Sequence, residues 1–239
     1  METLRTGAQA FGLELLAAQE LQFHRYREGL AEWNNHFNLT SKSALADIER
    51  VHFLDSLTLL PLLLREVPMP ARLIDIGSGA GFPGIPVKLL MPEFRMTLVE
   101  ATGKKAHFLR WMASELGLEG VDVREERAEE LGHDTEHRAA YDVALARAVG
   151  PLTTVLELTL PFCRVGGIAV VHRAGAVVEE VALATGVAET LGGRMRPALP
   201  VEVPGLREDA ALVVVEKIAP TDMRFPRRAG VPARRPLTA

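Results

Sequence analysis

"LIDIGSGAGFPGIPVKLL", residues 73–90, decides the fold class of this chain. A mostly apolar run containing Asp75 leads into four glycines that fall between positions 77 and 84. Glycine has no Cβ and can take positive φ, so a loop of this kind lets the backbone approach a ligand closely. In open α/β sheets that approach occurs at the turn between a strand and the following helix. The stretch therefore predicts a strand, a ligand-binding loop and a helix.

Strand-like runs recur along the chain. They are expected at 72–76, 95–100, 120–126, 141–148, 167–173 and 211–218, the last after a turn at Pro204 and Gly205. Helical segments are expected between them at 104–116, 152–163 and 176–192. Apolar strands that alternate with helices are typical of a parallel sheet covered on both faces. The expected fold is therefore α/β with a parallel sheet.

The two ends of the chain differ from this central part. Apolar residues recur at helical spacing over 10–34 and again over 48–60, before two prolines end the unit. We therefore expect a helical N-terminal extension at 1–70 and the sheet domain at 71–219. From Arg224 onward there are five arginines and no carboxylate side chain, so 220–239 is expected to be a basic tail on the surface.

Composition excludes several classes of protein. The chain has 239 residues, about half of them apolar (48%), and a single cysteine, Cys163. One cysteine rules out a disulfide framework and cysteine-rich zinc sites, and the seven histidines show no metal-ligand spacing, so no metal is expected. No stretch approaches the roughly 20 apolar residues that a membrane helix needs. We expect a soluble, cytoplasmic monomer without a membrane partner.

The neighbours of the glycines narrow the choice of ligand. The glycines match the G-x-G-x-x-G spacing of dinucleotide sites, which is a weak signal by itself. Asp75 places a carboxylate where a positively charged ligand group is accommodated better than a pyrophosphate. Pro83 and Pro86 fall where the next helix should begin, and proline has no N–H to donate to a phosphate. S-adenosylmethionine carries a sulfonium and no phosphate, so it fits this loop better.

Two further acidic positions fit an adenosine ligand. Glu100 closes the second strand, where a carboxylate can accept hydrogen bonds from both ribose hydroxyls. NAD enzymes use a similar carboxylate, so Glu100 indicates a nucleoside without choosing between these cofactors. After the third strand, the Ala128 backbone and the Glu129 side chain are expected near the adenine. Glu129 is equally suited to an acidic helix start, where it would stabilise the helix dipole.

The basic tail indicates RNA binding. Guanidinium groups make bidentate contacts to phosphate, and Phe225 among them can stack on a base. A solvated tail stiffened by prolines is the alternative interpretation. The predicted RNA-binding residues are Arg224, Arg227, Arg228, Arg234 and Arg235.

The sequence contains no evident catalytic group. Cys163 looks like a small core residue rather than the nucleophile that methylation of cytosine carbon 5 requires. Ring nitrogen 7 of guanine carries a free lone pair and needs no base, so alignment alone can supply much of the rate. The catalytic residues therefore stay unassigned. Candidates to bound a guanine pocket are His36, Asn38 and Lys42.

His52, Asp55 and Ser56 lie within five residues of one another, which raises the question of a hydrolase triad. On a helix His52 and Ser56 share one face, whereas a nucleophilic serine is typically presented on a sharp strand-to-helix turn. We interpret the three residues as packing and local hydrogen bonds. Arg147 follows the fourth strand, so it is expected to point at the site, with a strand-end ion pair as the alternative.

Four segments together resemble one protein family. They are "NNHFNLT" at 34–40, "HFLDSL" at 52–57, "DIGSGAGFPGIP" at 75–86 and "RFPRRAGVPARRPL" at 224–237. Over nearly its whole length the chain closely resembles the bacterial glucose-inhibited division protein B family of small-subunit ribosomal RNA guanine-7 methyltransferases. The resemblance implies a Rossmann-like S-adenosylmethionine-dependent methyltransferase sheet with an N-terminal helical extension. It implies cofactor contacts at Gly77, Phe82, Glu100, Ala101, Thr102, Ala128, Glu129 and Arg147, to which we add Asp75 and Gly79.

One position departs from the pattern of that family. Members usually carry Ala-Leu-Lys and a small residue where this chain has Val171, His172, Arg173 and Ala174. Arg173 keeps the positive charge, but a planar guanidinium does not replace a point ammonium in a specific contact. We therefore assign no specific role to Arg173.

We predict an S-adenosylmethionine-dependent methyltransferase that modifies N7 of a guanosine in 16S ribosomal RNA, either as naked RNA or within the small ribosomal subunit. An NAD-linked oxidoreductase is one alternative, because the glycine spacing and Glu100 also allow it. A non-catalytic RNA-binding module on the same fold is the other. Binding of S-adenosylhomocysteine or of NAD separates the first alternative from the prediction, and methyl transfer separates the second.

Overall fold

The structure is a computed structural model that describes residues 1–203 and 205–238, so the turn expected at Pro204 and the last tail residue, Ala239, lie outside the described residues. Its centre is an eight-stranded sheet in the order β3-β2-β1-β4-β5-β8-β6, with β7 paired to β8. The strands are β1 (Arg72–Ile76), β2 (Arg95–Val99), β3 (Val121–Arg124), β4 (Tyr141–Arg147), β5 (Cys163–Ala174), β6 (Gly193–Met195), β7 (Leu199–Pro200) and β8 (Ala210–Lys217). The predicted α/β sheet is confirmed.

The sheet changes direction of growth at β1. Strands β1 to β5 are parallel, and β8 runs antiparallel to β5. Because β2 and β3 lie on one side of β1 while β4 and β5 lie on the other, β1 and β4 flank the point where ligands bind in open α/β sheets. Asp75 of β1 is in register with Leu98 of β2 and with Leu145 of β4. The carboxyl ends of these three strands therefore form one edge.

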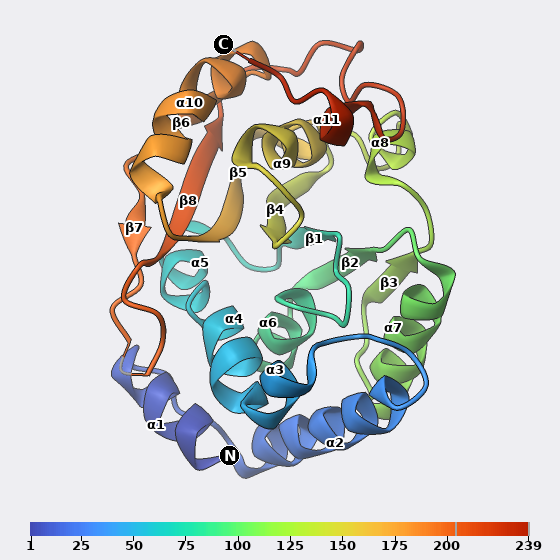
Figure 1. The fold of residues 1–239 in the computed structure, drawn as a ribbon, viewed down its shortest axis with the longest axis vertical. Helices are drawn as coiled ribbons and strands as arrows, with labels where there is room; N and C mark the ends of the chain where they lie inside the picture. The colour runs from blue at the N-terminus through green and yellow to red at the C-terminus, as the bar shows by residue number, and fades with distance from the viewer. Residues whose placement is uncertain (204, 239) are drawn as a thin grey trace.

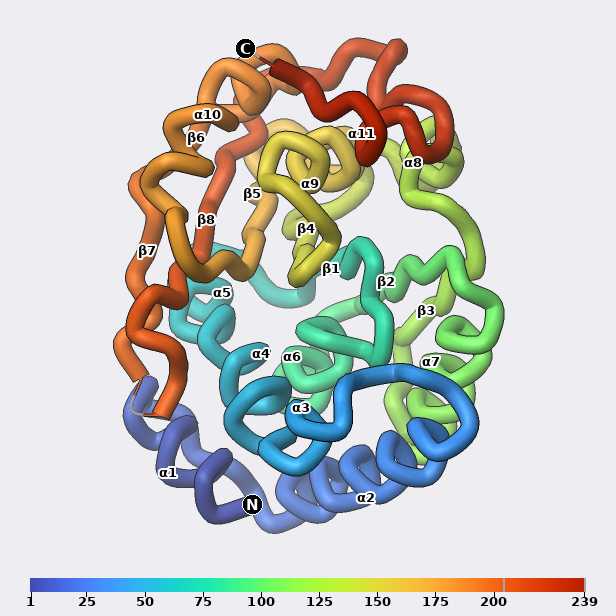
Figure 2. Tube along the Cα trace, in the orientation of Figure 1, coloured from blue at the N-terminus to red at the C-terminus, as the bar shows by residue number. Residues whose placement is uncertain are grey.

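Helices cover both faces of the sheet (Figures 1 and 2). After the N-terminal region they are α6 (Gly84–Leu90), α7 (Gly103–Glu115), α8 (Ala128–Leu131), α9 (Leu152–Thr159), α10 (Val177–Thr190) and α11 (Val231–Arg234). Side chains alternate along each strand, so Leu73 lies in one hydrophobic core and Ile74 in the other. The first core contains helices up to α7 and the second contains α9 and α10. Successive side chains of a strand are therefore apolar, because alternate ones pack into opposite cores.

The N-terminal extension folds onto the first of these cores. Its helices are α1 (Glu2–Ala10), α2 (Ala17–Asn34), α3 (Lys42–Ala46), the π-helix η1 (Glu49–Leu54), α4 (Asp55–Leu57) and α5 (Leu60–Glu66). The helix predicted over 10–34 is therefore wrong for residues 11–16, and α1 was not predicted over 2–9. Gly12 takes φ of 76° after α1, and the Gln19 side chain accepts the Leu16 N–H where α2 begins. These local contacts break the apolar periodicity into two helices.

The remaining differences between prediction and structure concern short elements and the limits of α9 and β5. Strands β6 and β7 contain three and two residues, which is too short for a pattern of alternation to be detected. The helix predicted over 152–163 ends at Thr159, and β5 begins at Cys163, four residues before the predicted strand. The other strands begin and end close to the predicted positions. No helix in the described part of the chain combines the length and the hydropathy needed to cross a lipid bilayer.

An aromatic contact joins the N-terminal extension to the glycine loop. The rings of Tyr26 on α2 and Phe82 in the loop are stacked with centroids 5.3 Å apart. The buried Tyr26 hydroxyl donates a hydrogen bond of 2.5 Å to the carbonyl oxygen of Ala80. A Cβ at Gly81 would lie 2.6 Å from that hydroxyl oxygen, so only glycine permits this approach. The loop is therefore held by the helical extension as well as by the sheet.

We expect Tyr26→Phe to lower the free energy of unfolding by about 1–3 kcal/mol, because it leaves the buried carbonyl of Ala80 without its donor. The aromatic packing on Phe82 is kept in this variant. Urea unfolding followed by circular dichroism measures the loss. An unchanged free energy of unfolding would show that the hydroxyl does not anchor the loop.

Candidate functional site

The glycine loop lies over the carboxyl ends of β1 and β2. The N–H groups of Gly77 and Ser78 donate to the carbonyl oxygen of Val99 at 2.9 and 3.0 Å. Gly77 has φ of 70°, and a Cβ there would lie 2.9 Å from a methyl group of Val149. The first glycine is thus required both for its backbone conformation and for its closeness to the turn after β4.

Asp75 lies beneath this loop and is fully buried. Its Oδ2 accepts the Gly84 N–H at 3.0 Å, and its Oδ1 has no partner within the described residues. Burial raises the pKa of this carboxyl to about 7, although the Gly84 N–H acts in the opposite direction. The side chain therefore supports the end of the loop, and it is not among the residues that line the neighbouring cavity.

The start of α6 offers no free N–H group to a phosphate. Pro83 and Pro86 have no N–H, the Gly84 N–H is given to Asp75, and the Ile85 N–H is given to the carbonyl oxygen of Gly81. A pyrophosphate site at a strand-to-helix turn depends on such donors. The local geometry therefore disfavours a dinucleotide and is compatible with a ligand that has no phosphate.

A cavity of about 210 Å³ opens beside the loop. It lies over the ends of β1 and β2 and against the start of α8. Six of the residues predicted for the cofactor line it, namely Gly77, Glu100, Ala101, Thr102, Ala128 and Glu129. The structure also places Ile76, Val99, Glu126, Arg127, Val149 and Leu158 in its wall, and sequence reasoning missed these. Val149 could have been predicted from the sequence, because it comes directly after the fourth predicted strand. Ala101 and Thr102, which come directly after the second strand, were predicted on that position.

Glu100 connects the loop to α7. Its Oε2 accepts the Gly79 N–H at 3.1 Å, and its Oε1 accepts the Thr102 N–H at 2.8 Å. A carboxylate has about four lone-pair positions, so two hydrogen bonds leave capacity for two hydroxyl donors. The carboxylate is mostly buried, with 8% of the residue exposed, and it borders the cavity. This geometry fits a ribose diol, and Gly79 acts through Glu100 rather than by lining the cavity.

The C-terminal segment lies beside α8 and α9 (Figure 1). Glu129 is buried, and its Oε1 accepts the Gly230 N–H at 2.8 Å. Phe225 is buried in the second core, and Arg138 donates to the carbonyl oxygens of Thr221, Asp222 and Phe225. Residues 221–235 therefore form a docked strap next to α8 and α9.

Arg227 anchors this strap. Its guanidinium and its backbone N–H bind the fully buried Glu157 carboxylate of α9, with a shortest distance of 2.6 Å. Arg227, predicted to bind RNA, therefore has a structural partner inside the chain. Arg228, Arg234 and Arg235 are exposed and form no salt bridge with the described carboxylates, and Arg224 lies 3.8 Å from Asp222.

Phe82 and Arg147 lie on the other side of the loop, away from the cavity beside Glu100. The Phe82 ring stacks on the His52 ring with centroids 4.4 Å apart, and the Arg147 guanidinium lies 5.1 Å from the Phe82 centroid. Arg147 donates to Asp55 Oδ2 at 2.7 Å and contacts His52 Nδ1 at 2.8 Å. The strand-end ion pair that was the alternative for Arg147 is therefore present.

The protonation of His52 follows from its partners. Because a guanidinium can only donate, Nδ1 of His52 must accept, and Nε2 must carry the proton that bonds to Thr40 Oγ1 at 2.8 Å. Burial, assisted by the nearby Arg147, lowers the pKa of His52 to about 4. The neutral ring packs on Phe82, while Ser56 donates to the carbonyl oxygen of His52. This matches the interpretation of these residues as packing and local hydrogen bonds.

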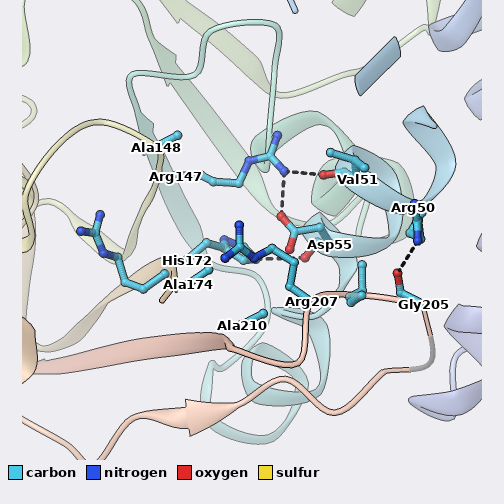
Figure 3. A pocket seen from close by; sticks show the side chains of 12 residues that line it. Arg50, Val51, Asp55, Arg147, Ala148, His172, Ala174, Gly205, Arg207 and Ala210 are labelled. Atoms are coloured by element: carbon cyan, nitrogen blue, oxygen red, sulfur yellow. Dashed lines mark hydrogen bonds and ion pairs between the residues drawn. The ribbon is translucent and has the colours of Figure 1, made fainter. Parts of the chain in front are cut away.

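A second, larger cavity of about 530 Å³ lies beyond Arg147, at the ends of β4 and β5 (Figure 3). Arg147 and Ala148 line it, whereas Val149 lines the cavity beside Glu100, so the two cavities share the turn after β4. The lining comprises Arg50, Val51, Asp55, Arg147, Ala148, His172, Arg173, Ala174, Gly205, Leu206, Arg207 and Ala210. The sequence analysis did not predict this cavity, because its residues come from distant segments.

Three residues considered for a guanine pocket lie elsewhere. His36, Asn38 and Lys42 are exposed and do not line either cavity. The preceding Asn34 instead shapes this segment, since its Oδ1 accepts the N–H groups of Leu39 and Thr40. Arg173 also has a structural partner, because its guanidinium forms an ion pair of 2.5 Å with Glu180.

Comparisons with known sequences agree on one family. The family model described as rRNA small subunit methyltransferase G matches residues 19–196. The protein named Ribosomal RNA small subunit methyltransferase G from Roseiflexus sp. (strain RS-1) is 48% identical over 237 residues, which cover 99% of this chain and 100% of the relative. The protein of that name from Dehalococcoides mccartyi (strain CBDB1) is 41% identical over 237 residues, with coverage of 99% and 100%.

Comparisons with solved structures concern the fold. A SAM dependent methyltransferase from Aquifex aeolicus aligns with a TM-score of 0.51 and 14% identity, covering 69% of this chain and 93% of that chain. A mutant of MtNAS in complex with S-adenosylmethionine aligns with a TM-score of 0.54 and 16% identity, covering 84% and 73%. The sheet is therefore of the Rossmann-like methyltransferase type, as expected.

Asp75→Asn tests the burial of the carboxyl beneath the loop. An unfolded aspartate has a pKa of about 3.9, so the folded state binds the extra proton between pH ~4 and ~7. The contribution of Asp75 to stability is therefore present at low pH and is lost as the pH rises through about 7. The measurement is the free energy of unfolding in urea at several pH values. The value of the variant should rise relative to that of the wild type as the pH rises, by at most about 1.4 kcal/mol per pH unit. A difference independent of pH would contradict the assignment.

Arg227→Met tests the anchoring of the strap. The change leaves the buried Glu157 carboxylate without its guanidinium, and we expect the free energy of unfolding to fall by about 3 kcal/mol. Arg228→Ala is the matched control, since an exposed side chain should change stability by no more than about 0.5 kcal/mol. The double change Arg227→Met with Glu157→Leu should recover much of the loss. Equal stability of Arg227→Met and Arg228→Ala would mean that the strap is not held by this ion pair.

Proposed function

The chain belongs to the ribosomal RNA small subunit methyltransferase G family, and from this premise we propose that it methylates N7 of a guanosine in 16S ribosomal RNA. Membership of the family makes it an rRNA methyltransferase that uses S-adenosylmethionine. The target atom, and the roles of individual residues, are the content of the proposal.

One local observation carries the assignment of residues to the cofactor. Glu100 keeps free lone pairs at the edge of a cavity, next to a helix start whose N–H groups are all absent or already bonded. A ribose diol satisfies the first feature, and a ligand without phosphate satisfies the second. S-adenosylmethionine meets both requirements, whereas the pyrophosphate of NAD would meet no donor at α6.

The chain would hold the cofactor at three places. Glu100 binds the ribose hydroxyls, the loop at Gly77 and Gly79 allows close approach of the methionine part, and Ala128 with Glu129 borders the adenine. When bound, the cofactor supplies an electrophilic methyl group on a sulfonium, with the thioether as the leaving group. The strap acts on this site through the bond from the Gly230 N–H to Glu129.

The acceptor chemistry agrees with the residues present. Ring nitrogen 7 of guanine carries a free lone pair that would accept the methyl group that the bound cofactor supplies. No proton is removed, so no general base is required. Cys163 is fully buried, and burial raises its pKa to about 12, so it is not available as a nucleophile for carbon methylation.

The exposed arginines of the strap are the proposed contacts to RNA phosphate. Arg224, Arg228, Arg234 and Arg235 lie on a segment that borders the cofactor cavity through Glu129. Phosphate contacts of this type position the RNA without reading its sequence. Arg227 is left out of this set because it holds the strap in place.

The proposal includes a monomeric enzyme acting in the cytoplasm, where its proposed substrate, 16S ribosomal RNA, is found. Gel filtration with light scattering would test the first point. A stable dimer at micromolar concentration would change the assignment of the oligomeric state without affecting the chemistry.

Methyl transfer from labelled S-adenosylmethionine tests the function. We expect label in RNA of small ribosomal subunits or in naked 16S rRNA, recovered as 7-methylguanosine after nuclease digestion and mass spectrometry. Label in another nucleoside, or none in either substrate, would overturn the proposal. Label in another nucleoside would mean that a different atom is methylated. The absence of label would favour a non-catalytic RNA-binding module.

Glu100→Ala tests the cofactor site separately. Loss of a charged acceptor for the ribose should weaken binding of S-adenosylhomocysteine by roughly 10- to 100-fold in calorimetry. Asp122→Ala, which removes an exposed carboxylate on β3, serves as the control. If the wild-type protein binds NAD and does not bind S-adenosylhomocysteine, the oxidoreductase alternative is supported instead.

A further inference from the structure

The cavity at the ends of β4 and β5 has no assigned role. Its volume of about 530 Å³ suits a small ligand or a single nucleotide. It lies at the same edge of the sheet as the cofactor cavity, and the turn after β4 separates the two. A nucleotide seated in it would therefore lie next to the donor of the methyl group.

The side-chain acceptor atoms in this cavity come from Asp55 and His172, which lie close together (Figure 3). Asp55 uses Oδ2 for Arg147, while its Oδ1 carries no hydrogen bond within the described residues. His172 is buried, with 8% of the residue exposed, and its Nδ1 has no partner in the described part of the chain. A buried polar atom without a partner is uncommon and costs about 1–3 kcal/mol.

The tautomer of His172 is fixed by its other nitrogen. Nε2 lies 3.0 Å from the carbonyl oxygen of Asp55, which can only accept, so Nε2 carries the proton. Burial lowers the pKa of His172, so the ring is neutral and Nδ1 presents a lone pair. The wall of the cavity thus contains two side-chain acceptors, the charged Asp55 carboxylate and the neutral, buried Nδ1 of His172, and its other charged members are guanidinium groups that only donate.

A guanine that reacts at N7 must be recognised through its opposite edge. A donor placed on N7 would occupy the lone pair that forms the new bond. The opposite edge carries N1–H and the N2 amino group, which are donors and require acceptors. Adenine presents an unprotonated N1 on that edge, which a carboxylate repels.

We infer that this cavity is the acceptor-nucleotide site, in which Asp55 and His172 accept hydrogen bonds from the N1–H and N2 amino groups of guanine and leave N7 free. Val51, Leu206 and the alanines of the lining contact the faces of the base. Arg207, at the exposed rim, binds an RNA phosphate. The inference rests on the proposed function, because it names the residues that select the base.

Nucleotide binding to the protein saturated with S-adenosylhomocysteine tests the inference. GMP should bind, IMP, which lacks the N2 amino group, should bind roughly tenfold more weakly, and AMP should bind more weakly still. Asp55→Asn should weaken GMP binding by roughly 10- to 100-fold and leave S-adenosylhomocysteine binding unchanged. Since Asp55 also pairs with Arg147, His172→Phe provides a second variant that keeps this pair and should weaken GMP binding by roughly 5- to 10-fold.

Nitrogen NMR of the histidines gives a readout that a structural role would not move. In the wild type the Nδ1 resonance of His172, assigned by its absence in His172→Phe, should shift when GMP is added and stay in place with AMP. Equal affinity for GMP and AMP, or GMP binding unaffected by both variants, overturns the inference. So does a failure of GMP to bind a wild-type protein that methylates RNA. Failure of the proposed function has a different signature, namely no methyl transfer by the wild type to any RNA.

The phosphate contact has a matched pair of variants. Arg207 and Arg194 have side chains 69% and 67% exposed, and each pairs with one carboxylate residue, but only Arg207 lines the cavity. Arg207→Ala should weaken RNA binding and reduce its dependence on salt, whereas Arg194→Ala should leave both unchanged. Equal effects of the two changes would remove the phosphate contact from this inference.

Discussion

The hydrogen bond from the Gly84 N–H to the buried Asp75 carboxylate sets the position of the glycine loop, and the remaining site is arranged around that loop. It draws the start of α6 down onto β1 and uses the donor that a phosphate would otherwise take. Tyr26 of α2 holds the same loop by packing on Phe82 and by donating to the carbonyl oxygen of Ala80. A backbone held at two points can present a cleft to a ligand without rearranging.

Two segments that are far apart in sequence complete the site from opposite ends. The N-terminal extension brings Tyr26, His52 and Asp55 to the loop and to Arg147, and it does so through the first hydrophobic core. The C-terminal strap reaches Glu129 from the second core. Both ends of the chain are therefore parts of one catalytic unit, although neither belongs to the central sheet.

The turn after β4 organises the chemistry, because it separates the cofactor cavity from the cavity that we assign to the acceptor. Val149 faces the first cavity, and Arg147 and Ala148 face the second. Methyl transfer to a ring nitrogen needs alignment more than acid or base groups. A protein that places two ligands on either side of one turn would meet that need without a catalytic dyad.

The sequence by itself determined the α/β class, the glycine loop and the strand-end carboxylate Glu100, which we assign to the ribose, because glycine spacing, strand periodicity and strand-end positions are local properties. It also identified the family, since several motifs occur together. Tertiary structure alone decided the use of Arg227 and the grouping of Asp55 with His172. Arg227 looked like part of a solvated tail until the buried Glu157, 70 residues away, became its partner. Asp55 and His172 are 117 residues apart, and no local pattern reports which side chains a folded sheet brings together.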